Sequence, residues 1–229
     1  MFPTKSFRGF YPSDFDCCRE LRWPNVFFDR EVLDEVLKNE EFRPFAFYAL
    51  AAHGKCKDFK HAYKSGIDLK QKDSKGCSLG AACLYASIMF TRDNKETSSK
   101  IKFLMKHGVD INEPCECGTT AIAIAVNISS LTLVNLLKSL GGNPDIKNLN
   151  GEIAISNFLV DSKEIAQLLV TEKTDFNVPC MYGNRLVKSF REQGFKDVLS
   201  VMKEVQPEYF AKKTPRQIGL KKTPTISLE

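Results

Sequence analysis

The side chains best suited to covalent chemistry are thiols and imidazoles, of which the chain has eight and three. His53, Cys56 and His61 lie close together in the segment AHGKCKDFKH. A cysteine paired with a histidine can act as a nucleophile. This segment, however, falls at a turn and at the start of a helix, and no oxyanion-forming loop or acidic orienting residue is apparent. We therefore expect structural roles for these residues and no catalytic residue.

A zinc site is the second chemical possibility, with Cys115, Cys117 and Cys180 as ligands. Cys115 and Cys180 end the matching motifs NEPC and NVPC, which lie two units apart in the repeat described below. Because packed helices are about 8–10 Å apart, the two turns should be separated by roughly 20 Å. The chain also contains neither GxGxxG nor a GxxxxGK phosphate loop. We expect no metal, no cofactor and no enzymatic activity. The alternative is an enzyme or modifier that uses residues 1–42 or a reactive cysteine.

Composition indicates an ordinary globular chain with a mild basic excess. Apolar residues make up 43% and charged residues 27% of 229, and the net charge is +5. This charge is small for a dedicated nucleic-acid binder, so nucleic acid is not an expected partner. No apolar run approaches the ~20 residues that span a bilayer, and the N-terminus MFPTKSFRGF has no signal-peptide core. With too few cysteines for a disulfide scaffold, the sequence favours a cytoplasmic protein without membrane contact.

An internal repeat organises most of the chain. Acidic or amide residues recur in matching segments at Asp68, Asp110, Asn143 and Asp175, spaced 42, 33 and 32 residues apart. Glycines recur in step at 76, 118, 151 and 183. Each of the acidic or amide residues comes after a segment whose apolar residues have helical spacing. The polar segment FTRDNKETSS accounts for the longer first interval as an insertion near 91–99, expected in the turn between two helices.

The third unit carries the clearest family signature. In CGTTAIAIA, Gly118, Thr120, Ile122 and Ala125 stand at the Gly, Thr, Leu and Ala positions of the ankyrin pattern GxTPLHxA. The chain thus resembles the ankyrin-repeat family, with divergent repeats. The resemblance implies an all-α fold: an ankyrin-type solenoid of stacked helix pairs with β-turn or hairpin loops, plus an N-terminal helical cap.

Several positions depart from the family pattern. Phe158 and Phe190 replace a small residue at the helix contact and should splay or rotate those helices. Lys173 stands where other units have glycine, so we expect a strained or reshaped turn there. The usual histidine of the pattern is replaced in each unit by Ala81, Ala123, Ser156 or Lys188.

Three regions follow from the repeat. Residues 1–42 form an aromatic-rich segment and a helix over EVLDEVLKN, either as a cap on the stack or as a separate docking element. Residues 43–204 form a stack of about five units. Residues 205–229 form a basic tail, expected to be disordered because its apolar content is low.

The family binds partners through the tips of its hairpin turns and the exposed faces of its first helices. By resemblance, this implies a protein-interaction module or adaptor, of which a host-directed bacterial effector in the host cytosol is one version. Leu149, Met181 and Tyr182 could form an interface hot spot, or they could pack against the C-terminal segment. The partner-binding positions implied at the tips are Ser74, Lys75, Cys77, Glu116, Cys117, Thr119, Leu149, Asn150, Glu152, Met181, Tyr182 and Asn184.

Overall fold

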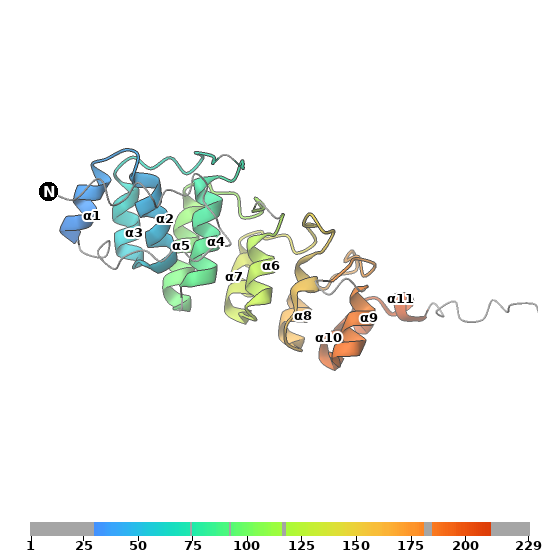
Figure 1. Ribbon diagram of the computed structural model, residues 1–229. Coiled ribbons are helices and arrows are strands. Elements are labelled where there is room, and N and C mark those ends of the chain that lie inside the picture. The colour runs from blue at the N-terminus through green and yellow to red at the C-terminus, as the bar shows by residue number, and fades with distance from the viewer. Residues whose placement is uncertain (1–29, 74, 92, 116–117, 181–184, 212–229) are drawn as a thin grey trace, which may run out of the picture.

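The computed structural model describes residues 30–73, 75–91, 93–115, 118–180 and 185–211, and regular structure there is helical apart from isolated β-bridges. The helices stand in two rows (Figure 1). The first row consists of α2 Arg43–His53, α4 Leu79–Phe90, α6 Ala121–Asn127, the 3-10 helix η2 Ala154–Asn157 and α9 Leu186–Gln193. The second row consists of α3 Cys56–Tyr63, α5 Asn94–Lys106, α7 Leu131–Ser139, α8 Lys163–Leu169 and α10 Lys196–Val205.

Each first-row helix packs on the second-row helix that follows it, and neighbouring pairs pack side by side. Helix α4 shows why this side-by-side packing of helix pairs is stable. Its sequence LGAACLYASIMF is buried from Leu79 to Ile88 because α2, α5 and α6 surround it. Small residues there allow close approach, as at Gly80, where an added Cβ would meet Val109 Cγ2 at 2.6 Å. One helix pair could not bury such a surface alone, so the pairs depend on their neighbours.

Three second-row helices begin at a capping side chain that accepts hydrogen bonds from the first turn: α5, α7 and α8. Asp93 accepts from the N–H groups of Lys95 and Glu96 at the start of α5. Ser130 and Ser162 do the same for Leu133 and Ile165 at the starts of α7 and α8. Such caps satisfy amide groups that have no partner inside the helix. They fix where α5, α7 and α8 begin.

The expected insertion near 91–99 lies elsewhere than predicted. Only residues 91–93 connect α4 to α5, and the extra residues lengthen both helices instead. Helix α4 has 12 residues and α5 has 13, against 7 in α6 and 9 in α7. The physical reason is the cap at Asp93, which starts a helix inside the polar segment.

The fourth pair is irregular at Phe158, where the sequence predicts disturbance. Its first helix is reduced to the four residues of η2, and Phe158 is the residue that ends it. The ring of Phe158 is buried and meets the ring of Phe190 edge-on, with centroids 6.1 Å apart. A large ring thus occupies the contact where a small side chain would let the helix continue.

The turn at Lys173 is reshaped, as predicted. Gly66, Gly108 and Gly141 have positive φ angles of 90°, 81° and 94°, a conformation that a lysine adopts only with strain. Lys173 does not adopt it. Instead, the hydroxyl of Thr171 accepts from the Lys173 N–H, and that of Thr174 accepts from the Thr171 N–H.

Both ends of the stack are covered by helices. At the N-terminal end α1 Arg30–Leu37, which overlaps the helix predicted over residues 31–39, packs on α2 and α3 and buries Leu33 and Leu37. The expectation of disorder from residue 205 onward is wrong for 205–211. There α11 Pro207–Ala211 packs on α10, and Tyr209 and Phe210 contact Phe176. Residues 1–29 and 212–229 lie outside the described residues. No described helix is long and apolar enough to cross a membrane.

Candidate functional site

Three hairpin tips, at residues 73–77, 115–119 and 148–152, share one backbone geometry. In each, the N–H of the first residue donates to the carbonyl of the fifth, over 3.0, 2.9 and 2.8 Å. The fourth residue is Gly76, Gly118 or Gly151, with φ of 83°, 79° and 78°. The period seen in the sequence therefore places one tip on each of three successive pairs (Figure 1).

A side chain at the first position holds two of these tips rigid. Asn148 Oδ1 accepts from the N–H groups of Asn150 and Glu152, both at 2.9 Å. Asp73 Oδ1 accepts in the same way from Lys75 and Cys77, at 3.0 and 2.9 Å. Hydrogen bonds from a short polar side chain to nearby backbone N–H groups stabilise this turn conformation relative to others. In the 148–152 tip, these bonds hold Leu149 and Asn150 out from the stack, where both are exposed.

The second and third tips lie against each other. A Cβ built on Gly118 would meet the Leu149 amide nitrogen at 2.7 Å and the Asn148 Cα at 3.0 Å. Hydrogen bonds also connect neighbouring repeat units next to the tips. The side chain of Asn112 accepts from the N–H of Asn143 at 2.8 Å and donates to the Gly141 carbonyl at 3.1 Å. The three tips recur on successive pairs, and we call their described residues the tip edge (73, 75–77, 115, 118–119 and 148–152).

The predicted partner-binding residues divide by exposure. Lys75, Leu149 and Asn150 are exposed, and Thr119 is half-buried. Six of the predicted positions lie outside the described residues: Ser74, Glu116, Cys117, Met181, Tyr182 and Asn184.

Two predicted positions are buried and cannot offer their side chains to a partner. Cys77 is 5% exposed and Glu152 is 8% exposed. In these two tips the amide of the fifth residue donates to the side chain of the first residue, and the fifth side chain turns inward. The Glu152 carboxylate also accepts from the Asn148 side-chain amide at 2.7 Å. These two residues shape the tip edge rather than present a contact.

Leu149 is the most exposed large apolar side chain of the described part of the chain, at 79%. Residues 205–211, the described part of the C-terminal segment, leave Leu149 at this exposure. The described part of that segment lies on Phe176 instead, where the Tyr209 ring centroid is 5.3 Å from that of Phe176. An isolated exposed leucine is common on protein surfaces. Here it stands on a tip with a fixed backbone.

The cysteine and histidine candidates have structural surroundings. His61 Nε2 lies 2.5 Å from Asp34 Oδ1 on the neighbouring α1. Cys56 is buried, and its N–H donates to Glu96 at 2.6 Å. Burial raises the pKa of the Cys56 thiol, that of Cys77 to about 12, and that of Cys83 well above its ordinary value. Because the thiolate is the nucleophile, these environments oppose thiol chemistry.

The same residues do not assemble into a metal centre. Within the ranges that the structure describes, no three His, Cys, Asp or Glu side chains gather closely enough to hold a metal ion. Cys115 and Cys180 are both buried in their own units. Cys117 is outside those ranges.

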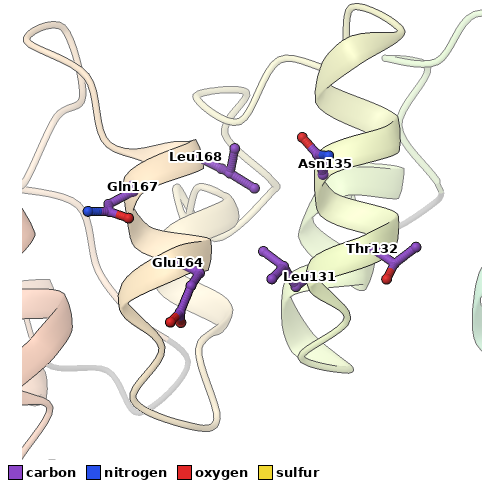
Figure 2. Close-up of a pocket in the computed structure, with 6 residues that line it drawn as sticks. All are labelled: Leu131, Thr132, Asn135, Glu164, Gln167 and Leu168. Carbon is purple, nitrogen blue, oxygen red and sulfur yellow. The ribbon is translucent and has the colours of Figure 1, made fainter.

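A feature that the sequence reading missed is an open groove of about 490 Å³ between α7 and α8. Leu131 and Leu168 face the space between the helices in Figure 2. Leu131 is 43% exposed. The sequence feature that could have indicated this groove is Leu131, an apolar residue directly after the Ser130 cap, where a helix usually faces water. Thr132, Asn135, Glu164 and Gln167 complete its lining.

Comparison with protein-family models and with curated protein sequences gives no match to this chain.

Proposed function

We propose that this chain is an ankyrin-type repeat protein that binds another protein through its tip edge. The observation that carries the proposal is Leu149, whose apolar side chain stands exposed on a tip that Asn148 holds in one shape. Water contact with such a side chain is unfavourable, and its removal by a partner would contribute about 1.5–3 kcal/mol.

Support for the ankyrin-type assignment comes from geometry that repeats with the sequence period. Helix pairs recur in two rows, and hairpin tips with the same hydrogen bond and the same positive-φ glycine recur on successive pairs. Departures such as η2 lie where the sequence departs from the family pattern. A divergent ankyrin stack accounts for both the regular and the irregular pairs.

Support for the binding role comes from preorganisation. A loop that is already fixed loses little conformational entropy when a partner binds, so more of the contact energy appears as affinity. Asn148 and Leu149 lie against Gly118 of the preceding tip, where an added Cβ would meet the Leu149 amide nitrogen at 2.7 Å, so the neighbouring tip supports the backbone that presents Leu149. The expected partner surface has an apolar pocket for Leu149 and polar groups for Asn150.

The test is affinity purification from the native cell with three forms of the full chain: unchanged, Leu149→Asp and Ile128→Asp. Ile128 is a matched control because it is also an exposed apolar residue, at 44%, but lies in the turn between α6 and α7. We expect a partner protein that the unchanged chain and Ile128→Asp recover and Leu149→Asp loses. Equal recovery by all three forms would rule out the tip edge as the binding surface.

A further inference from the structure

Helices α3 and α5 carry an unusual concentration of lysine on their outer surface. They are neighbours in the second row (Figure 1). Every one of these side chains is exposed. We call this surface the lysine face: Lys57, Lys60, Lys64, Lys95, Lys102 and Lys106.

The spacing aligns these side chains in two lines. In α3 and the residue after it, lysines follow at intervals of three and four, and in α5 at intervals of seven and four. Residues so spaced lie on one side of a helix. At 1.5 Å per residue the lines are about 10 and 16 Å long, and packed helices set them about 8–10 Å apart. Lys60 Nζ lies 6.0 Å from the centre of the Phe103 ring and so reaches across the seam.

No acidic side chain within the described ranges neutralises the lysine face. The acidic residues of the two helices are Asp58 and Glu96. Asp58 pairs with Arg30 at 3.0 Å, and Glu96 accepts from the N–H of Cys56. The six lysines form no ion pair with any described residue. Like charges at these intervals oppose helix formation, so intramolecular stability does not explain the pattern.

Two of the six lysines, Lys57 and Lys95, are each followed by an acidic residue, but Lys60, Lys64, Lys102 and Lys106 are not. On α8 and α10, by contrast, Lys163, Lys196 and Lys203 are each followed at once by Glu or Asp. Mixed charges of this kind are an ordinary solvated surface. The basic excess is therefore a property of α3 and α5 rather than of the whole row.

We propose that the lysine face is a second binding surface, which docks an acidic segment of a partner protein. This goes beyond the proposed function of the tip edge and does not depend on it. Lysine is a mobile point charge without the planar fork that arginine offers to phosphate. A flexible chain rich in Asp and Glu can follow two lines of such charges without a fixed geometry.

Other anionic partners fit this surface less well. Single-stranded nucleic acid needs aromatic faces for base stacking, but Tyr63, Phe103 and His107 are half-buried and pack on one another at the seam. A membrane surface is usually met by exposed apolar side chains that insert. Among the described residues, the exposed large apolar side chains lie outside α3 and α5.

The test compares two four-lysine variants of the full chain. The first is Lys60→Gln, Lys64→Gln, Lys102→Gln and Lys106→Gln, on the lysine face. The matched control is Lys163→Gln, Lys188→Gln, Lys196→Gln and Lys203→Gln, which changes the net charge equally on mixed-charge helices. Glutamine keeps the helix propensity of lysine. Both variants keep the same termini, so any contribution from those segments is common to them.

The probe is a fluorescent twelve-residue peptide of Asp, Glu and Gly, and binding is followed by anisotropy at 50 and 300 mM salt. A 20-base-pair DNA and vesicles of 30% phosphatidylserine serve as competing probes. We expect the lysine-face variant to weaken peptide binding at low salt about tenfold, since four screened charge contacts of this kind together amount to about that factor. The control should change it less than threefold, and the thermal midpoint of the lysine-face variant should not fall.

Equal weakening by the two variants would overturn the proposal, because net charge alone would then explain binding. Failure of the unchanged chain to bind the peptide at 50 mM salt would overturn it as well. Tighter, face-dependent binding of DNA or vesicles than of the peptide would assign the lysine face to that other partner and reject the acidic segment. None of these results bears on Leu149, so the tip edge is tested separately.

Discussion

The buried ammonium of Lys100 donates a hydrogen bond of 2.8 Å to the carbonyl oxygen of Ala51. Lys100 is on α5 and Ala51 is near the end of α2, so the bond joins two helix pairs. The same carbonyl accepts from the hydroxyls of Ser87 and Thr91, at 3.2 and 3.3 Å. Lys100 forms no ion pair with any described residue. The first two helix pairs are thus linked through the buried Lys100 ammonium, which forms no ion pair with a described carboxylate.

Stability should rise with pH because of this lysine. Burial lowers the pKa of Lys100 from 10.5 to about 8 in the folded protein. Above about pH 8 the folded state has lost a proton that the unfolded state still binds, so unfolding becomes less favourable up to about pH 10.5. We expect the contribution of Lys100 to the free energy of unfolding to grow by about 1 kcal/mol between pH 7 and 9. Urea denaturation at the two pH values measures it.

The matched variant is Lys100→Met, which keeps an unbranched chain and removes the titrating group. The difference in free energy of unfolding between the unchanged chain and this variant should shift by that amount between pH 7 and 9. Using the difference removes the opposing effect of Cys77 and Cys83, whose raised pKa values lower stability above about pH 9. An identical pH profile for both proteins would show that Lys100 is not buried as a charge.

The contact between tips should make Gly118 more sensitive than Gly76. Both have φ near 80°, so alanine at either position costs about 1–2 kcal/mol of backbone strain. At Gly118 the new Cβ also meets the Leu149 backbone at 2.7 Å, whereas at Gly76 nothing lies within 4 Å. We expect Gly118→Ala to lose about 1–3 kcal/mol more than Gly76→Ala in urea denaturation. Equal losses would mean that the tips do not touch.

Burial should make the described thiols unreactive. We expect Cys56, Cys77 and Cys83 to react with a disulfide reagent at pH 7.5 at least about tenfold more slowly in the folded chain than in denaturant, since buried thiols stay protonated. Replacing Cys17, Cys18 and Cys117 by serine confines labelling to described positions. One folded-state thiol that reacts faster than in denaturant would favour the enzymatic alternative instead.

The side chain that fastens α11 should be a large contributor to stability. Gln206 Nε2 donates to the carbonyls of Thr171 and Thr174, each at 2.8 Å, and the residue is buried. Gln206→Ala leaves both bonds unmade and should cost about 1–3 kcal/mol. Gln206→Glu should cost more at pH 7 than at pH 4.5, because its carboxylate would face two carbonyl oxygens. A cost independent of pH would argue against the burial of this contact.

The tips could be predicted from the sequence because their chemistry is local. A positive φ requires Gly76, Gly118 and Gly151, and a short polar side chain at the first position fixes the loop. Burial of Cys77 and Glu152 was missed, since which side chain turns inward depends on that bonding and on the stack behind it. Spacing alone does not specify it.

Helix lengths were less predictable for a related reason. The polar segment after Phe90 fits both a loop and an exposed helix, and only the cap at Asp93 decides between them. The shortening of η2 follows from Phe158 packing edge-on against Phe190 in the next unit. By contrast, the lysine face is visible in the sequence as intervals of three, four and seven once α3 and α5 are known to be neighbours.

The most direct test of the tip edge as a protein-binding surface is site-specific photo-crosslinking in the native cell. A benzophenone amino acid is placed at position 149, at 75 or at 128 of the full chain, and adducts are resolved by mass. We predict that one partner protein is captured from positions 149 and 75 and not from 128. Capture of a partner from position 128, with no adduct from 149 or 75, would contradict the account.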